Sequence, residues 1–295
     1  MNKNIKSKFW QKLATEDVQC ILCPRNCIIK NGSSGYCGAR QNHNGILYLN
    51  VYGYPAALNA DPIEKKPFAM YMQGTRTFSV GCYGCNLNCS FCQNYHISKN
   101  LPPKNFKEKF RFLNPLEIVE KAISAGCESI ALTYNEPTIW AEYGIDIAVE
   151  AKKNGLPVVL VSNGYINEKP AAAFYKHIDA ANIDMKGFSE LFYKEMTDGK
   201  LEPVLNSIKL LYSMNKHIEL TNLVIPNKND SDEMIQNYLK WVSDNFGHEI
   251  SLHFSAYFPC YKYLSSPPTS PNTLYRIRDI ASSYGFKNVF LGNLR

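Results

Sequence analysis

Residues 84–94 read GCNLNCSFCQN, with cysteines at Cys85, Cys89 and Cys92. Their spacing is C-x3-C-x2-C, and Phe91 stands directly before the last of them. Thiolates are soft ligands that bind iron–sulfur clusters and zinc. Because a [4Fe–4S] cluster bound only by protein takes four thiolates, a tight group of three indicates a cluster with one iron open to another ligand. A zinc knuckle or part of a disulfide set is the alternative interpretation of these residues.

Length and composition limit the class of protein. The chain has 295 residues, 45% of them hydrophobic, which is enough for one large core with a small appendage. No run approaches eighteen apolar residues, so no membrane partner is expected, and residues 1–10 lack the apolar core of a signal peptide. Ten cysteines in a chain this large are typical of metal ligands, which predicts a reducing, cytoplasmic location. The net charge of +6 permits an anionic partner without requiring nucleic acid.

A second cysteine group lies nearer the start of the chain, at Cys20, Cys23, Cys27 and Cys37. Four thiols at x2, x3 and x9 spacing form a complete ligand set, and the glycines around Cys37 permit tight turns around a metal. A structural zinc and an auxiliary iron–sulfur cluster both fit this set, and four unrelated core thiols are the remaining possibility. The spacing does not choose among them.

The organisation of the chain changes near residue 75. Before it, residues 45–72 carry short apolar runs broken by glycine and proline, which indicates a small β-rich lobe. Residues 61–68 (DPIEKKPF) are interpreted as a charged turn that joins this lobe to the main domain. We therefore predict an N-terminal metal-binding lobe over residues 1–74 and a main domain over residues 75–295.

Beyond residue 75, strand-like runs alternate with amphipathic helical patterns. The predicted strands cover residues 78–83, 129–134, 158–162, 181–185, 218–225, 250–255 and 288–291. The predicted helices include one that begins at Asn114, with Pro115 and Glu117 in its first turn, and one over residues 232–246 capped by Asp230 and Glu233. Such repeated strand–helix units predict an α/β fold with a parallel sheet covered by helices.

Polar side chains follow several of these strands, where α/β folds place their chemistry. They are Tyr134, Asn135 and Glu136 after the second strand, Ser162 and Asn163 after the third, Asp184 and Lys186 after the fourth, Asn222 in the fifth, and His253 in the sixth. Each also has a simpler interpretation. Glu136 can favour a helix dipole, Ser162 and Asn163 can form a turn, Asp184 and Lys186 can form an ion pair, and His253 can be a core residue.

The cysteine spacing, with an aromatic residue before the third cysteine, resembles the signature of the radical S-adenosylmethionine (radical SAM) superfamily. Further motifs, CxLCPRxC, GYCGAR, DPIEKKP, TYNEPT, SNGYI, IDMKGF and LHFSAYFP, extend the resemblance over residues 18–293. They resemble the radical SAM proteins of the AmmeMemoRadiSam system, a branch related to pyruvate formate-lyase activase. The resemblance implies a partial (β/α)6 barrel of the TIM type. Members of this branch commonly continue past residues 292–293 into a cysteine-bearing tail, which this sequence does not contain.

The resemblance also implies a chemistry. In this superfamily the open iron of the cluster held by Cys85, Cys89 and Cys92 chelates the amine and carboxylate of SAM. One electron then cleaves SAM to methionine and a 5′-deoxyadenosyl radical. Residues matching the SAM-binding motifs of the branch are Tyr134, Asn135 and Glu136 for the amine, Asp184 and Lys186 for the carboxylate, the stretch from Asn222 for adenine, and His253 facing the SAM site. TYNEPT departs from the usual Gly-Gly-Glu-Pro at its Tyr134-Asn135 pair.

The implied function is an enzyme that uses this radical to modify an unidentified substrate, either protein-borne or an anionic small molecule. An electron donor such as flavodoxin or ferredoxin is expected. A glycyl-radical-enzyme activase is the first alternative, although the extra clusters of activases tend to follow the SAM cysteines. An iron–sulfur or zinc module that binds RNA through the basic and aromatic residues 99–111 is the second alternative. A solvated loop beside the site is the favoured explanation of that run, so nucleic acid is not the expected partner.

Overall fold

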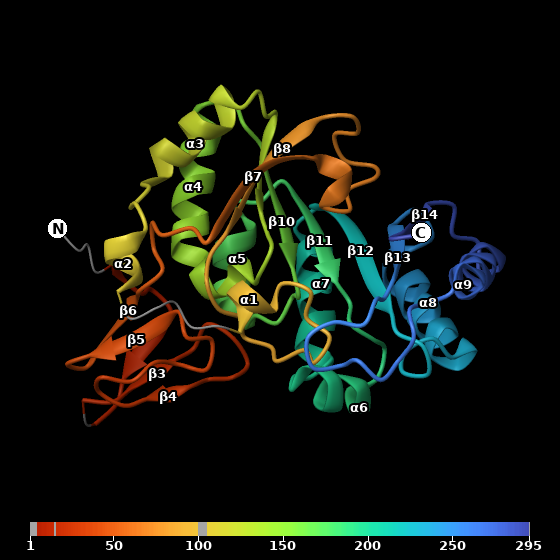
Figure 1. The fold of residues 1–295 in the computed structure, drawn as a ribbon, viewed down its shortest axis with the longest axis horizontal. Coiled ribbons are helices and arrows are strands. Elements are labelled where there is room, and N and C mark those ends of the chain that lie inside the picture. The colour runs from red at the N-terminus through yellow and green to blue at the C-terminus, as the bar shows by residue number, and fades with distance from the viewer. Residues whose placement is uncertain (1–4, 15, 100–104, 295) are drawn as a thin grey trace.

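An eight-stranded sheet forms the centre of the computed structural model, which describes residues 5–14, 16–99 and 105–294 (Figure 1). Its strand order is β14-β13-β12-β11-β10-β9-β8-β7. The strands are β7 (Ala57–Pro62), β8 (Arg76–Gly81), β9 (Ser129–Leu132), β10 (Val158–Ser162), β11 (Ala180–Asp184), β12 (His217–Val224), β13 (Ser251–Ala256) and β14 (Val289–Gly292). Neighbours from β8 to β14 pair in parallel, whereas β7 pairs antiparallel with β8. Among the described residues β7 and β14 pair with no further strand, so the barrel is partial and open.

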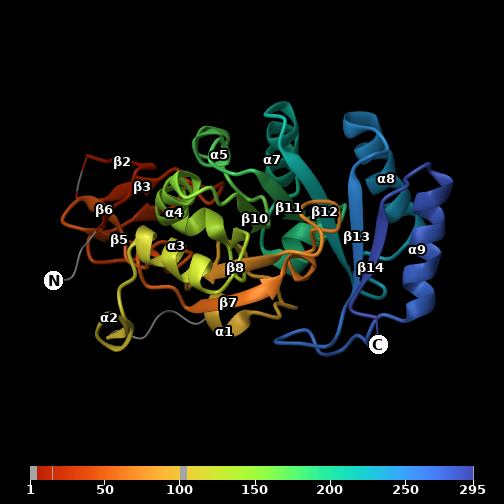
Figure 2. The same ribbon diagram turned by 90° about the horizontal axis from the view of Figure 1, so that it is seen from above.

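Helices between the strands cover the outer face of the curved sheet (Figure 2). They are α3 (Pro115–Ser124), α4 (Ala141–Lys153), α5 (Glu168–Tyr175), α7 (Glu202–Ser213), α8 (Asp232–Phe246) and α9 (Pro271–Ser283). Shorter helical turns are α1 (Tyr95–Ser98), α2 (Phe106–Lys109), α6 (Glu190–Phe192), η1 (Ile63–Lys65), η2 (Pro137–Trp140) and the π-helical η3 (Tyr193–Thr197). The predicted α/β fold is confirmed. No described helix has the length and apolar character needed to cross a membrane.

Helix starts follow the local sequence with one correction. The side chain of Asn114 accepts from the Glu117 amide at 3.0 Å, and the Glu117 carboxylate accepts from the Asn114 amide at 2.9 Å, which is the predicted capping box of α3. The predicted caps of α8, Asp230 and Glu233, are wrong. Ser231 is the N-cap of α8, because its short hydroxyl accepts from the third helical amide, while Asp230 instead accepts from the Asn227 amide at 2.7 Å.

The N-terminal part carries two small antiparallel sheets. One joins β1 (Ile5–Lys6), β6 (Ile46–Leu49) and β5 (Arg40–His43), and the other joins β2 (Trp10–Lys12), β3 (Val18–Cys20) and β4 (Ile28–Ile29). The division at residues 74 and 75 remains a prediction. The large sheet begins before it, because β7 lies within residues 1–74 and pairs with β8 over its whole length.

The segment after β7 enters the barrel. Ile63 and Phe68 are fully buried and pack with Ala131, Val159 and Ala180 in a hydrophobic cluster separate from the main core. Residues on either side of Ala131 belong to the main core under the helices, so strand alternation turns Ala131 to the inner face of the sheet. Small inner side chains leave room for the Phe68 ring. We call residues 61–70 the plug segment, because their buried side chains, Ile63 and Phe68 among them, pack on the inner face of the sheet.

Hydrogen bonds fix the plug segment to the strands. The side chain of Asn182 on β11 donates to the Pro67 carbonyl at 2.6 Å, and the amides of Ala69 and Met70 each donate to the Glu219 carboxylate of β12 at 2.9 Å. The charged turn predicted to join two domains is therefore an internal part of the barrel. Figure 1 shows η1, within this segment, at one end of the sheet and α1, just after the cysteine loop, at the other.

Candidate functional site

A cavity of about 780 Å³ opens inside the partial barrel. Of the residues predicted to bind a cluster or SAM, those that line it are Cys85, Cys89, Cys92, Tyr134, Asn135, Glu136, Ser162, Asn163, Asp184, Lys186 and His253. They come from the loops and strand ends of β8 to β13, segments far apart in sequence. The parallel arrangement brings them together because all these strands end at the same edge of the sheet.

The loop that carries the three cysteines is held by hydrogen bonds on both sides. The Asn88 amide donates to the Thr197 carbonyl at 2.7 Å and the Ser90 amide to the Met196 carbonyl at 3.0 Å, which ties the loop to η3. Asn135, after β9, donates from its side chain to the Gly84 carbonyl at 2.7 Å. The thiol-bearing loop is therefore fixed before any ligand binds.

The three thiols are soft metal ligands on the wall of the cavity. Burial raises the pKa of Cys85 to about 12 and that of Cys89 to about 11. The positive charges of Lys99 and Lys186 oppose this effect. A metal that binds these thiols must therefore displace the thiol protons. Among the residues that the structure describes, no group of three or more His, Cys, Asp or Glu side chains is arranged to hold one metal ion. Three soft thiols that line one cavity are the ligand type that an iron–sulfur cluster would take.

Glu136 is a buried carboxylate without a cationic partner among its hydrogen bonds. Its Oε1 accepts from the Thr138 amide at 2.9 Å and the Ser162 hydroxyl at 2.7 Å, and its Oε2 accepts from the Asn163 amide at 2.8 Å. A carboxylate has about four acceptor positions, so one is left. Burial raises the pKa of Glu136, against these three donors that lower it. A cation in the cavity would relieve the buried charge.

Asp184 and Lys186 form an ion pair at the end of β11, with Nζ and Oδ2 2.5 Å apart. Burial alone lowers the pKa of Lys186, but the charge of the Asp184 carboxylate and its hydrogen bond outweigh burial and raise the pKa. Lys186 is therefore a permanent cation on the cavity wall. It lies on the same wall as the thiol of Cys89, whose pKa it lowers.

Tyr134 and Asn135 line the cavity but also have structural roles that the sequence did not indicate. The Tyr134 hydroxyl donates to the Asp61 carboxylate of the plug segment at 3.1 Å, and its backbone adopts a positive φ of 70°. The side-chain oxygen of Asn135 accepts from the Cys82 amide at 3.2 Å and the Trp140 indole at 3.3 Å. Both residues position the loops around the cavity.

Asn222 departs from its predicted position, since it does not line the cavity. Successive side chains of a strand point to opposite faces, and Thr221 and Leu223 are the ones that line it. The Asn222 side chain instead donates to the Met185 carbonyl at 2.7 Å and joins β12 to the end of β11.

His253 lines the cavity and contacts a buried carboxylate that the sequence analysis missed. Its Nε2 is 2.6 Å from Glu219 Oε2, and its ring stacks on Phe290 with centroids 5.1 Å apart. Burial alone raises the pKa of Glu219, but hydrogen bonds from His217, His253 and the plug amides hold it at about 2. Glu219 and Thr221 are two residues apart on β12 and therefore share a face, whereas the sequence analysis turned Asn222, on the opposite face, toward the cavity.

The plug segment supplies five further residues of the cavity wall that the sequence analysis missed, Glu64, Lys65, Lys66, Pro67 and Ala69. The Lys66 ammonium lies 2.9 Å from Asp61 Oδ2 and 4.4 Å from the centre of the Tyr134 ring. The DPIEKKP motif was the signal, but a charged run gives no indication that the chain enters a barrel.

The group Cys20, Cys23, Cys27 and Cys37 lies beside the cysteine loop. Burial has the largest effect on the pKa of Cys23 and raises it, while a backbone hydrogen bond lowers it. Cys37, Cys20 and Cys27 each raise this pKa further, so the four thiols lie within electrostatic range of one another. A Cβ added to Gly84 would overlap the carbonyl oxygen of Cys37, so the two cysteine regions are in direct contact. A second metal centre here remains a prediction.

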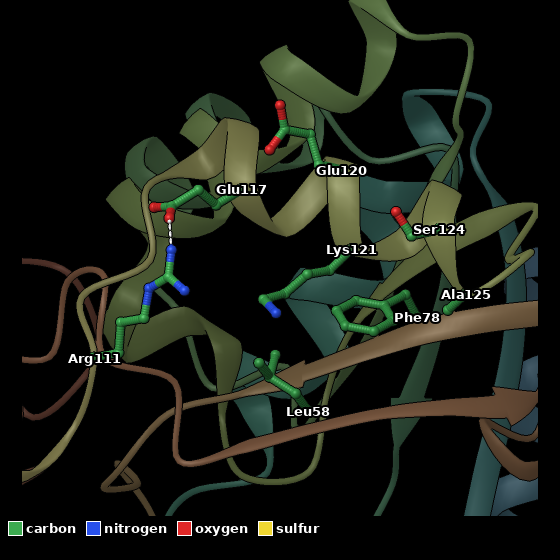
Figure 3. Close-up of a pocket in the computed structure, with 8 residues that line it drawn as sticks. All are labelled: Leu58, Phe78, Arg111, Glu117, Glu120, Lys121, Ser124 and Ala125. Atoms are coloured by element: carbon green, nitrogen blue, oxygen red, sulfur yellow. Dashed lines mark hydrogen bonds and ion pairs between the residues drawn. The ribbon is translucent and has the colours of Figure 1, made fainter.

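A second hollow, on the outer face, is separate from all these residues. It lies between α3 and the β7–β8 hairpin and is lined by Leu58, Phe78, Arg111, Glu117, Glu120, Lys121, Ser124 and Ala125 (Figure 3). Arg111, at the end of the run considered for RNA, pairs with Glu117 at 2.6 Å. Residues 100–104 of that run lie outside the described residues. This hollow contains no thiol, and we do not consider it the site.

Comparisons with known proteins agree with this geometry. A sequence model of the radical SAM superfamily matches residues 79–240. An uncharacterized protein of Methanocaldococcus jannaschii is 42% identical over 289 residues, covering 98% of this chain and 85% of that protein. A putative glycyl-radical enzyme activating enzyme of the same organism is 28% identical over 208 residues, covering 68% of this chain and 75% of that protein. The crystal structure of a radical SAM methyltransferase from Sphaerobacter thermophilus shares the fold, with a TM-score of 0.55 and 13% identity over 73% of this chain and 66% of that one.

Proposed function

Because this chain belongs to the radical SAM superfamily, we propose that it binds a [4Fe–4S] cluster through Cys85, Cys89 and Cys92 and acts on a substrate with the help of SAM. The observation that carries the proposal is one cavity lined by three thiols, a buried carboxylate without a cationic partner and a lysine ammonium. When bound, the cluster supplies the electron that cleaves SAM to methionine and a 5′-deoxyadenosyl radical.

The residues around the thiols match the two charged ends of a methionine group. Glu136 has one acceptor position left for an ammonium, and a buried carboxylate gains most from a cation. One N–H donor of the Lys186 ammonium faces Asp184. The other donors bind the carboxylate of the methionine group. Ser162 and Asn163 hold Glu136 in place, so they act through its orientation.

The branch of the superfamily is part of the proposal. The motifs CxLCPRxC, DPIEKKP and TYNEPT favour the AmmeMemoRadiSam group, and an external donor such as flavodoxin or ferredoxin supplies the electron. Similarity to a putative glycyl-radical enzyme activating enzyme supports an activase as the second candidate. In an activase the substrate is a glycine of a partner protein.

A second metal centre at Cys20, Cys23, Cys27 and Cys37 completes the proposal. The thiols raise one another's pKa values, which places them near enough to one another to support a shared metal centre. A structural zinc and an auxiliary iron–sulfur cluster both suit four thiolate ligands. Iron, sulfide and zinc analysis of protein prepared without oxygen distinguishes the two.

The test of the central proposal is anaerobic reconstitution of the wild type and of a Cys85→Ala/Cys89→Ala/Cys92→Ala variant. After reduction with SAM present, we expect 5′-deoxyadenosine from the wild type only. Cys127→Ala is the matched control, because Cys127 is a buried thiol that does not line the cavity, and it should retain the product. Equal product from the wild type and the triple variant would refute the assignment.

A further inference from the structure

The side chains of Asn86 and Asn163 form a hydrogen-bonded pair beside the thiol of Cys85. Asn86 follows Cys85 in the cysteine loop and is fully buried, and Asn163, after β10, is 6% exposed. Asn163 Nδ2 donates to Asn86 Oδ1 at 3.0 Å and also lies 3.9 Å from Cys85 Sγ. The group that binds Glu136 is the backbone amide of Asn163, so the side-chain pair needs an explanation of its own.

Backbone groups of Tyr165 fix the orientation of both side-chain amides. The Tyr165 amide donates to Asn163 Oδ1 at 2.9 Å, and the Tyr165 carbonyl accepts from Asn86 Nδ2 at 2.7 Å. A backbone N–H can only donate and a carbonyl can only accept, so neither side-chain amide can turn over without losing its partner. The side-chain N–H groups of Asn163 are therefore held toward Asn86 and Cys85.

The sulfur of Cys85 lies near two N–H donors. The Leu87 amide donates to it at 3.4 Å, and Asn163 Nδ2 approaches it at 3.9 Å. Asn86 engages one of the two side-chain hydrogens of Asn163, so the other is left for the sulfur. A thiolate is a stronger acceptor than a thiol, so these donors act most strongly once a metal has displaced the thiol proton.

Two charged groups act on Cys85 with opposite signs. Burial has the largest effect on the pKa of Cys85 and raises it, the Lys99 ammonium lowers it, and the Glu136 carboxylate raises it. Glu136 thus places a negative charge near the sulfur, where it opposes any gain of negative charge. Asn163 contacts both groups, since its backbone amide binds the carboxylate and its side chain faces the sulfur. In so buried a site a hydrogen-bond donor acts more strongly than it does in water.

We propose that the Asn163 side chain raises the reduction potential of the cluster that the cysteine loop binds. Reduction makes the cluster and its thiolates more negative, and an N–H group that faces Cys85 Sγ stabilises that charge. Hydrogen bonds to the sulfurs are one of the ways in which a protein sets the potential of an iron–sulfur cluster. Asn86 is a positioning residue, because it holds the Asn163 amide in place. The inference rests on the proposed function, which assigns the cluster to this loop.

Redox titration of the reconstituted holoprotein without SAM, followed by electron paramagnetic resonance, tests this role. Asn163→Ser keeps a hydroxyl acceptor for the Tyr165 amide but loses the amide donor. Asn163→Asp keeps the shape and the acceptor and replaces the donor with a negative charge. At a fixed potential, we expect the ratio of reduced to oxidised cluster to fall about threefold to tenfold in Asn163→Ser, as for the loss of one hydrogen bond, and further in Asn163→Asp.

Ser162→Ala is the matched control. Ser162 precedes Asn163, and its hydroxyl donates to Glu136 rather than to Cys85. The control should weaken SAM binding several-fold and leave the potential of the cluster without SAM unchanged. Asn163→Ser should show the reverse pattern, because the backbone amide that binds Glu136 is still present.

An unchanged potential in both Asn163 variants would overturn the inference. An equal shift in Ser162→Ala would overturn it as well, because it would indicate a general disturbance of the loop. The potential is measured only on protein that has bound a cluster, so lower cluster loading in a variant does not affect the comparison. Iron and sulfide content and formation of 5′-deoxyadenosine by the wild type report on the proposed function separately.

Discussion

The buried ion pair between Arg40 and Glu142 offers the sharpest test of how the N-terminal part is joined to the barrel. Both side chains are 1% exposed, and Nη1 lies 3.0 Å from Oε1, with a second contact between Nη2 and Oε2. Arg40 also donates to the Ile139 carbonyl at 3.0 Å, and Glu142 accepts from the Lys8 amide at 2.8 Å. The pair therefore connects the GYCGAR motif to the start of α4.

Arg40→Met removes one partner and leaves the Glu142 carboxylate buried without its cation. Breaking a buried pair in this way costs about 3–5 kcal/mol, a large part of the roughly 5–15 kcal/mol that stabilises a typical domain. The double variant Arg40→Met/Glu142→Met removes both charges and leaves only the Ile139 carbonyl and Lys8 amide without partners. We therefore expect the double variant to lose about 2 kcal/mol less than the sum of the two single losses.

The assay is urea unfolding of each variant under anaerobic conditions, followed by tryptophan fluorescence. Lys153→Met is a suitable control, because its pair with Glu150 on the same helix is exposed and contributes at most about 1 kcal/mol. Additive losses, each below about 1 kcal/mol, would show that the pair does not hold the two parts together.

Acid provides an independent check of the same pair. Burial alone raises the pKa of Glu142, but the charge of Arg40 outweighs it and holds the pKa below its ordinary value. A carboxyl with a lowered folded-state pKa contributes stability above its unfolded pKa of about 4.3, and that stability is lost as the pH falls through the folded-state value. The difference in unfolding free energy between the wild type and the double variant should thus be constant near neutral pH and shrink only in acid.

Three further predictions concern the two cysteine regions and the SAM residues. Cys23→Ala should lower total metal content yet leave SAM affinity of the folded protein within several-fold, measured by equilibrium dialysis; complete loss of SAM binding with an intact Cys85 loop cluster would contradict it. Glu136→Ala and Lys186→Ala should each weaken SAM binding about tenfold to a hundredfold while cluster content stays the same, because each removes a charge-assisted contact, and unchanged affinity in both would show that SAM is oriented differently. Gly84→Ala should destabilise the protein by roughly 1–3 kcal/mol or more. Gly84 has a φ of 99°, and a new Cβ there would overlap the carbonyl oxygen of Cys37. Unaltered urea unfolding would exclude that close approach.

The sequence by itself determined the fold class and most of the strand ends. Periodicity and capping are local, so the strands from β8 to β14 and the capping box of α3 were predictable to within a few residues. The cysteine spacing is local as well, and a parallel sheet necessarily places its strand ends at one edge. For these reasons Glu136, Asn163 and Lys186 were expected near the thiols before their positions were known.

Tertiary structure decided the rest. Whether Asn222 or Thr221 faces the cavity depends on which face of β12 turns inward, and a strand buried on both faces carries no polarity pattern that tells them apart. Glu219 meets residues of the plug segment about 150 positions earlier, and Arg40 meets Glu142 about 100 positions later. No local pattern encodes such pairings, because each side chain finds its partner only after the sheet has curved and the plug segment has entered the barrel. The sequence thus specified which chemical groups are present at the strand ends, and the packing of the plug segment and the N-terminal sheets decided which of those groups face the cavity.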